Sequence, residues 1–294
     1  MWSNRDPVEV LASALGVAPH LIECIGRVDR GYGNRSYRLR YADDEYVVRF
    51  GAAPEHLPGV DRQAEHAALV AAAARSLAPE PIVCDPASGL LITRYLAGRT
   101  WTAADFTDRH QLVRLGRTFA ALHAIPPPAG MRRLDLAVHV AALEARTTPV
   151  SARLGAAAGT LIARLGGSAP VLCHNDVHAG NVIDDGCLRL IDWEYAAIGD
   201  PRFDLAGPIS YHRLGSDACE ALLEGYGGDT RVIEPERLGC AIWLFEYVAC
   251  LWELALPERF EAAAEPPVAV MQQPVRQRLR QLERLLDEPT KPLI

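Results

Sequence analysis

The segment with the clearest chemical potential is residues 171–194, VLCHNDVHAGNVIDDGCLRLIDWE. An apolar run, VLC, is followed within eight positions by five polar side chains, which are His174, Asn175, Asp176, His178 and Asn181. A second apolar run then ends at Asp192, sixteen residues beyond Asp176. Polar groups set between two buried strands are held rigidly, so we expect a functional site in this segment.

The oxygen-bearing side chains of this segment suit phosphoryl transfer. Its loose transition state requires positioning and charge neutralisation more than strong base catalysis. Asp176 can orient an acceptor hydroxyl and take its proton, and we expect an ordinary low pKa to suffice because the hydroxyl becomes acidic as its bond to phosphorus forms. Asn181 and Asp192 offer hard oxygen ligands to a Mg²⁺ ion that bridges the phosphates of ATP. We expect His174 to support the loop through hydrogen bonds.

Two other interpretations of the segment stay open at this point. The pattern H-x-D-x-H at 174–178 could chelate a transition metal, because His and Asp are competent ligands. That reading leaves Asn181 and Asp192 without a role. Alternatively, the polar residues could simply satisfy the backbone of a buried loop.

The segment resembles the Brenner motif of the choline/ethanolamine kinase, thiamine kinase and aminoglycoside phosphotransferase superfamily, which shares the protein-kinase fold. The tripeptide HND and the following IDWEY are closer to the choline-kinase branch. The resemblance implies that Asp176 is the catalytic aspartate, that Asn181 and Asp192 bind the metal, and that ATP and Mg²⁺ are the cofactors. Val177 and Ala179 stand where Leu and Pro are more usual.

A glycine-containing run upstream, GYGNRS at 31–36, joins two strand-like runs as a lid over phosphates would. A plain hairpin turn fits the same residues. The resemblance assigns Gly31, Gly33 and Asn34 to the nucleotide loop. It also places Arg49 on the strand where protein kinases keep their phosphate-binding lysine, and a guanidinium can grip phosphate bidentately.

Four further residues follow from the same resemblance or support it. Glu65 lies in the helix after Arg49 and is the expected ion-pair partner of that arginine; an exposed arginine and an unrelated glutamate are the alternative. Tyr95 and Leu96 resemble the hinge whose backbone binds adenine. Asp204, in the run DPRFD, is expected to anchor the catalytic loop from below.

Aromatic residues gather in the second half of the chain, and they suggest the kind of acceptor. A quaternary ammonium lacks hydrogen-bond donors and is recognised by aromatic faces and nearby carboxylates. We predict a substrate site made of Glu194, Tyr211, Trp243, Tyr247 and Trp252, although an aromatic stripe at helical spacing also fits a core. Choline kinases tend to show two tryptophans three apart in this region. Here only Trp252 is present, so thiamine, ethanolamine or another amino alcohol stays open.

The elements that must position these residues fall into two parts. Strand-like runs at 22–28, 36–41, 45–50, 81–84 and 90–96, with a helix over 61–77 capped by Asp61, predict a small β-rich lobe. We expect Ala42, Asp43 and Asp44 to form a hairpin turn between the second and third runs. Apolar spacing after residue 102 predicts helices, interrupted by β structure at 171–192. We therefore predict an α+β, protein-kinase-like bilobal fold. Its N-terminal nucleotide-binding lobe would span 1–96, and its C-terminal catalytic and substrate-binding lobe 97–294.

The composition of the chain narrows the range of protein classes further. The 294 residues are 49% hydrophobic and carry a formal net charge of -7, which disfavours nucleic-acid binding. The only lysine is Lys291, so a Walker-A loop and Schiff-base chemistry are close to excluded. Seven scattered cysteines without a C-x-x-C pair indicate free thiols in a reducing cytoplasm. No secretion signal and no long uninterrupted apolar run is seen, so we expect a cytoplasmic protein without a membrane span.

Together these features predict an ATP- and Mg²⁺-dependent kinase that phosphorylates a hydroxyl of a small cationic metabolite such as choline, ethanolamine or thiamine. One alternative is an aminoglycoside or macrolide phosphotransferase, which would use the same machinery in antibiotic resistance. Another is a nucleotide-binding pseudokinase without turnover, which intact Asp176, Asn181 and Asp192 disfavour. A protein kinase is disfavoured because no long activation segment follows Asp192. The oligomeric state is open.

Overall fold

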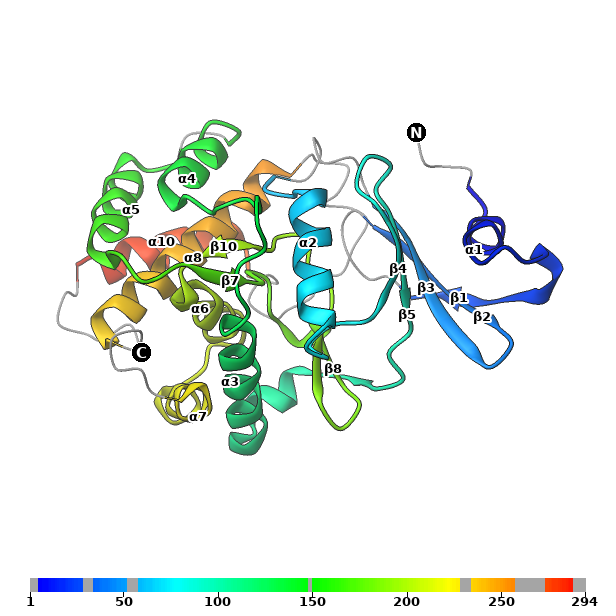
Figure 1. Ribbon diagram of the computed structural model, residues 1–294. Helices are drawn as coiled ribbons and strands as arrows, with labels where there is room; N and C mark the ends of the chain where they lie inside the picture. The colour runs from blue at the N-terminus through cyan, green and yellow to red at the C-terminus, as the bar shows by residue number, and fades with distance from the viewer. Residues whose placement is uncertain are drawn as a thin grey trace.

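The computed structural model describes residues 5–28, 34–51, 58–147, 150–227, 234–256 and 273–287. Within these ranges a five-stranded antiparallel sheet comes first and a mainly helical part follows (Figure 1). The α+β, bilobal arrangement predicted from the sequence is confirmed.

The sheet has the strand order β1-β2-β3-β5-β4, and every neighbouring pair is antiparallel. Its strands are β1 (Ile22–Arg27), β2 (Arg35–Tyr41), β3 (Asp44–Phe50), β4 (Pro81–Asp85) and β5 (Leu90–Arg94). A two-residue turn at Ala42 and Asp43 joins β2 to β3, and Ala42 has a φ of 52°. These strands and the tight turn agree with the sequence prediction.

A helix that the sequence analysis did not predict, α1 (Pro7–Leu15), covers part of the sheet. Its ends carry ordinary signals: the Asp6 side chain caps the start, and Gly16 ends the helix with a φ of 68°. Leu11 is fully buried in a cluster with apolar residues of the sheet, which include Leu39, Val48 and Ile92. The apolar spacing over so short a segment was too weak to predict this packing.

Helix α2 (Arg62–Ala73) lies between the sheet and the helical part (Figure 1). As predicted, Asp61 caps it by accepting hydrogen bonds from the backbone of Gln63 and Ala64. The buried face of α2, with Ala68 and Leu69, belongs to the same apolar cluster as residues of the helical part. Because that face packs against the larger lobe, the charged first turn of α2 lies where the two parts of the molecule meet.

The helical part is formed by α3 (Arg109–His123), α4 (Leu136–Glu144), α5 (Ala152–Leu165), α6 (Pro201–His212), α7 (Ser216–Tyr226), α8 (Pro235–Ala255) and α10 (Val275–Leu285). Helices α3 and α7 approach each other closely at two glycines. A Cβ at Gly116 would lie 2.1 Å from the Leu222 carbonyl oxygen, and one at Gly225 would lie 2.1 Å from the Val113 carbonyl oxygen. The two backbones therefore touch where no side chain intervenes.

Short strands frame the segment that carries the predicted chemistry. Strand β7 (Val171–Cys173) pairs with β10 (Ala197–Gly199), while β8 (Val182–Asp184) pairs with β9 (Leu188–Leu190) and with β6 (Arg99–Thr100). The polar residues 174–181 lie between β7 and β8, and residues 191–196 lie between β9 and β10. Fixed strand ends therefore hold both loops.

Within the described ranges, one helix, α8, is long and apolar enough to cross a membrane by length and composition. Most of it is buried inside the protein, in clusters that include Leu238, Trp243 and Leu251. Such burial is the pattern of a core helix, and length and composition alone are weak evidence for a membrane span.

Candidate active site

The loop after β7 is held by a carboxylate from below. Asp204, in the first turn of α6 and almost fully buried, accepts hydrogen bonds from the backbone N–H groups of His174 (2.9 Å) and Asn175 (2.6 Å). Asn175 has a φ of 66°, a left-handed conformation that costs free energy in a residue with a side chain. The Asp204 carboxylate, which accepts both backbone N–H groups, compensates for that strain. This is the geometry expected of a residue that anchors a loop.

His174 has no nitrogen left for a metal. Its Nδ1 accepts the backbone N–H of Asp176 at 3.3 Å, and its Nε2 donates to the Ile191 carbonyl at 3.0 Å. Burial lowers the pKa of His174, in keeping with this neutral tautomer. The H-x-D-x-H chelate considered above therefore does not form, and His174 ties the first polar loop to the second.

The side chains of His123, Cys173 and Asp204 also come within 4.8 Å of one another. Each is already engaged: His123 contacts Asp204 through Nε2 and the Tyr226 hydroxyl through Nδ1, and the Cys173 thiol points at backbone carbonyls. This buried group extends the loop anchor and is not a metal site.

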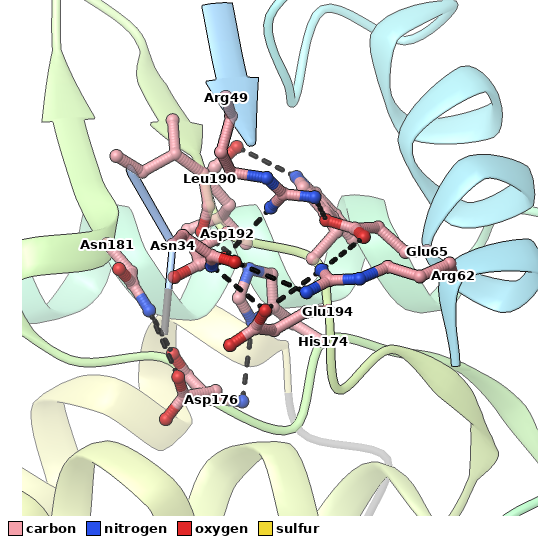
Figure 2. Close-up of polar contacts among 12 residues, drawn as sticks. Asn34, Arg49, Arg62, Glu65, His174, Asp176, Asn181, Leu190, Asp192 and Glu194 are labelled. Carbon is pink, nitrogen blue, oxygen red and sulfur yellow. Dashed lines mark hydrogen bonds and ion pairs between the residues drawn. The ribbon is translucent and has the colours of Figure 1, made fainter. Parts of the chain in front are cut away.

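Asp176 turns its carboxylate away from the loop backbone. Its Oδ1 accepts a hydrogen bond from the Tyr211 hydroxyl at 3.1 Å, and its Oδ2 lies 3.3 Å from the side-chain amide of Asn181. The same Asn181 amide group donates to the Asp176 carbonyl at 2.9 Å (Figure 2), so its Oδ1 remains the oxygen available to a metal. The Asp176 side chain is 19% exposed, enough to be reached by a ligand.

Asp192 stands opposite Asp176 and beside Arg49. Arg49, on β3, forms ion pairs with Glu65 on α2 (2.5 Å) and with Asp192 (3.3 Å) (Figure 2). The pairing of Arg49 with Glu65 expected from the sequence is therefore present, and both side chains are buried. Asp192 has a φ of 64° and keeps 35% of its side chain exposed. A strained backbone at a reachable carboxylate is typical of a functional position.

Burial and neighbouring carboxylates raise the pKa of both Asp176 and Asp192. Burial, and then the neighbouring charge of Asp192, raises the pKa of Asp176 well above its usual range. Burial and Glu194 likewise raise the pKa of Asp192, although Arg49 opposes them. The low, ordinary pKa expected for Asp176 is thus not what this environment produces without a cation.

This donor set fits a magnesium ion. Two carboxylates and an amide oxygen are hard ligands that Mg²⁺ prefers, and a divalent cation between them would favour their ionised forms. Asn181 and Asp192 lie on adjoining strand ends, since the Ile191 N–H donates to the Asn181 carbonyl at 3.0 Å. Asn181 and Asp192 would hold the ion, which would supply positive charge to neutralise a phosphate ligand.

A second set of polar contacts joins the two parts of the protein. Arg62 Nη1 donates to Glu65 (2.8 Å) and to Glu194 (3.0 Å), and Arg62 Nη2 donates to the Asn34 side chain (3.2 Å). The Asn34 amide donates in turn to Glu194 at 3.0 Å (Figure 2). Glu194, predicted to bind substrate, is therefore buried in this network, a correction to its sequence-based assignment. The sequence analysis missed Arg62, because an arginine in a helix carries no signal of its own.

Only some of the other residues predicted to bind the nucleotide are described by the structure. Gly31 and Gly33 lie outside the described residues. The Tyr95 N–H donates to the Glu45 carbonyl at 2.9 Å, the Arg38 guanidinium covers its ring at 3.8 Å, and the Leu96 carbonyl accepts from Gly98. Binding of adenine by Tyr95 and Leu96 stays a prediction.

The predicted aromatic box divides into two groups. Tyr211 contacts Asp176, and the half-buried Trp252 packs edge-on against Tyr195 with 6.2 Å between ring centroids. Trp243 and Tyr247 lie instead in the helical core, 1% and 0% exposed. Trp243 Nε1 donates to the Leu282 carbonyl and the Tyr247 hydroxyl to Glu144. Neither ring has a face left for a ligand, so we correct both to core residues; their helical spacing alone could not separate the two roles.

The arrangement of a two-part fold, a loop aspartate, two metal-type ligands and a buried arginine defines a phosphotransferase of the kinase-like class. Residues 25–238 match the family described as "Phosphotransferase enzyme family", and the chain belongs to that family.

Individual relatives agree with this family. The chain is 42% identical over 59 residues to Protein LicA of Haemophilus influenzae, a match that covers 20% of this chain and 22% of that protein. The solved choline kinase LicA from Streptococcus pneumoniae superposes with a TM-score of 0.73 at 20% identity, covering 94% of this chain and 97% of the other. A choline/ethanolamine kinase family protein from Mesorhizobium loti gives 0.70 at 23% identity, covering 97% and 96%. At these identities the superpositions show the fold.

Proposed function

We propose that this chain is an ATP- and Mg²⁺-dependent kinase that transfers the γ-phosphoryl group to a hydroxyl of a small cationic amino alcohol, with choline and ethanolamine as the leading acceptors and thiamine as a further one. The observations that carry this proposal are the hydrogen bond between Asn181 and Asp176, the charge of Asp192 close enough to act on Asp176, and the ion pair of Asp192 with the buried Arg49 (Figure 2).

In the proposed reaction, Asp176 accepts the proton of the acceptor hydroxyl as its oxygen bonds to the γ-phosphorus, and the bond to the β-phosphate oxygen breaks to release ADP. Tyr211 and Asn181 orient the Asp176 carboxylate through their hydrogen bonds. Arg49, held by Glu65, would bind phosphate oxygens. The metal ion supplies charge neutralisation on the phosphates.

The charges and the aromatic side chains near Asp176, where the acceptor would bind, favour an acceptor with a single ammonium group over a polycation. The half-buried Tyr195 and Trp252 offer aromatic surface near Asp176, and the buried Tyr211 reaches Asp176 through its hydroxyl. Two of the three acidic residues of α8, Glu246 and Glu253, are paired with Arg278, and the third, Glu236, is paired with Arg164. An aminoglycoside requires several uncompensated carboxylates, and in the described part of α8 all three carry a counter-charge.

Lobe boundaries and location complete the proposal. We place the nucleotide-binding lobe at 1–96 and the catalytic and substrate-binding lobe at 97–294, with the active site between them. A cytoplasmic setting agrees with the seven cysteines, which are all free thiols in the structure.

The test is ADP release from purified protein with ATP and Mg²⁺, using a panel of choline, ethanolamine, thiamine, an aminoglycoside and a macrolide. We expect turnover with an amino alcohol, loss of at least about 10³-fold in Asp176→Asn, and unchanged turnover in the control Asp185→Asn, whose carboxylate caps the nearby hairpin. Turnover with the aminoglycoside or macrolide alone would establish the antibiotic alternative. ATP binding without turnover on a broad acceptor panel would favour the pseudokinase.

A further inference from the structure

Arg62 is the best-connected charged residue between the sheet and the helical lobe. Its side chain is 4% exposed, and its two terminal nitrogens contact three side chains from different parts of the chain: Glu65 on its own helix, Glu194 after β9, and Asn34 before β2. Burying a guanidinium costs free energy unless its hydrogen-bonding and charged partners are well placed. The position of Arg62 among these three partners is therefore a specific feature of the fold.

Each partner of Arg62 either contacts a group proposed to hold MgATP or lies close to one in the sequence. Glu65 pairs with Arg49, so Arg62 fixes the carboxylate that fixes the phosphate-binding arginine. Glu194 follows the proposed metal ligand Asp192 by two residues. Asn34, one residue before β2, is hydrogen-bonded to Glu194 as well as to Arg62.

The contact between Arg62 and Glu194 is important because the backbone of the nearby Asp192 is strained. Asp192 holds a φ of 64°, which the surrounding structure must enforce. Before Asp192, Ile191 is fixed by its N–H bond to the Asn181 carbonyl, and directly after Asp192, Trp193 is buried with its Nε1 bonded to the Leu190 carbonyl. Further along the chain, Glu194 is fixed by Arg62 and Asn34 (Figure 2).

Space for the guanidinium is provided by a glycine. A Cβ at Gly51, just after β3, would lie 2.7 Å from Arg62 Nη2 and 2.9 Å from Arg62 Cζ. Any larger residue at 51 would push the guanidinium out of this position without removing a single charge.

From these contacts we infer that Arg62 is a positioning residue that couples Arg49, Asp192 and Asn34, so that MgATP binds to one preformed arrangement. The inference rests on the proposed function for its ligand. It assigns Arg62 no contact with the reacting atoms.

The test measures the dissociation constant of MgATP by calorimetry, which requires no acceptor. We expect Arg62→Met to weaken MgATP at least tenfold and Gly51→Ala to weaken it severalfold with every charge retained. The matched control is Arg278→Met, because Arg278 is an equally buried arginine that bridges two carboxylates, Glu246 and Glu253, within the helical lobe. This control should stay within twofold of the wild type.

A double-mutant cycle separates coupling from general loss of stability. Asn34→Ala should weaken MgATP in the wild type and add less than twofold in the Arg62→Met background, because its side chain acts through the same network. With a competent acceptor, the KM for ATP should rise while the KM for the acceptor stays within twofold.

Additive effects in the cycle, or MgATP affinity within twofold of the wild type in both Arg62→Met and Gly51→Ala, would overturn the inference and leave the proposed function intact. Failure of the wild-type protein to bind MgATP would overturn both.

Discussion

Replacing Asp204 with asparagine is a direct test of how the catalytic loop is held. Asp204 accepts three hydrogen bonds with a side chain that is 0% exposed: from Asn175 N–H (2.6 Å), His174 N–H (2.9 Å) and His123 Nε2 (3.0 Å). In Asp204→Asn one oxygen becomes an NH₂ group, which faces a donor instead of accepting from it. At least one charge-assisted bond is lost and one buried N–H loses its partner.

The size of the effect follows from those two losses. A hydrogen bond to a charged group contributes about 1.5–3 kcal/mol, and a buried donor without a partner costs about 1–3 kcal/mol. We therefore expect Asp204→Asn to lower the free energy of unfolding by about 3–5 kcal/mol. Domains have total stabilities of about 5–15 kcal/mol, so the variant should still be mostly folded at low temperature.

The assay is urea unfolding of wild type and variant, with turnover measured where the variant is folded. The urea dependence of the free energy should be unchanged, and kcat should fall by about 10²-fold because the loop that carries Asp176 is displaced. His123→Gln is the control, since the Gln amide can still donate to Asp204 and the cost should stay near 1 kcal/mol. A loss of less than about 1 kcal/mol in Asp204→Asn, with full turnover, would refute this account of the loop.

Three further predictions concern close packing, the aromatic residues and the metal. Gly116→Ala should destabilise the protein by about 1–3 kcal/mol or more, because the added Cβ forces α3 away from α7. Gly159→Ala is the control: its Cβ would meet no atom within 4 Å, so it should stabilise the protein by up to about 1 kcal/mol. Thermal melting compares the two variants, and equal effects would contradict the proposed backbone contact. Trp243→Phe should lower stability by about 1–3 kcal/mol and leave the KM for the acceptor unchanged, while Trp252→Ala should raise that KM; the opposite pattern would return Trp243 to the substrate site. Chelation of Mg²⁺ should abolish turnover, and Asp192→Asn should require higher Mg²⁺ for half-maximal turnover; a Mg²⁺ titration that matches the wild type would remove Asp192 from the metal site.

Much of the fold could be predicted from local patterns. The strands of the small lobe, the turn at Ala42 and Asp43 and the Asp61 cap each depend on neighbouring residues, and each was found where expected. Helix α1 was not predicted although Asp6 and Gly16 signal its ends, because its stability comes from packing on a sheet that is distant in sequence.

For the site, the sequence by itself determined which groups we propose to carry the chemistry. The fixed spacing of Asp176, Asn181 and Asp192 reflects two loops joined by one hairpin, so their proximity is a local property of the chain. What only the tertiary structure decided is the environment of each group. Trp243 and Tyr247 became core residues, and Glu194 became a partner of Arg62, 132 residues away. Burial and contacts between distant elements depend on how helices and sheet pack, and residue type and spacing contain no record of that packing.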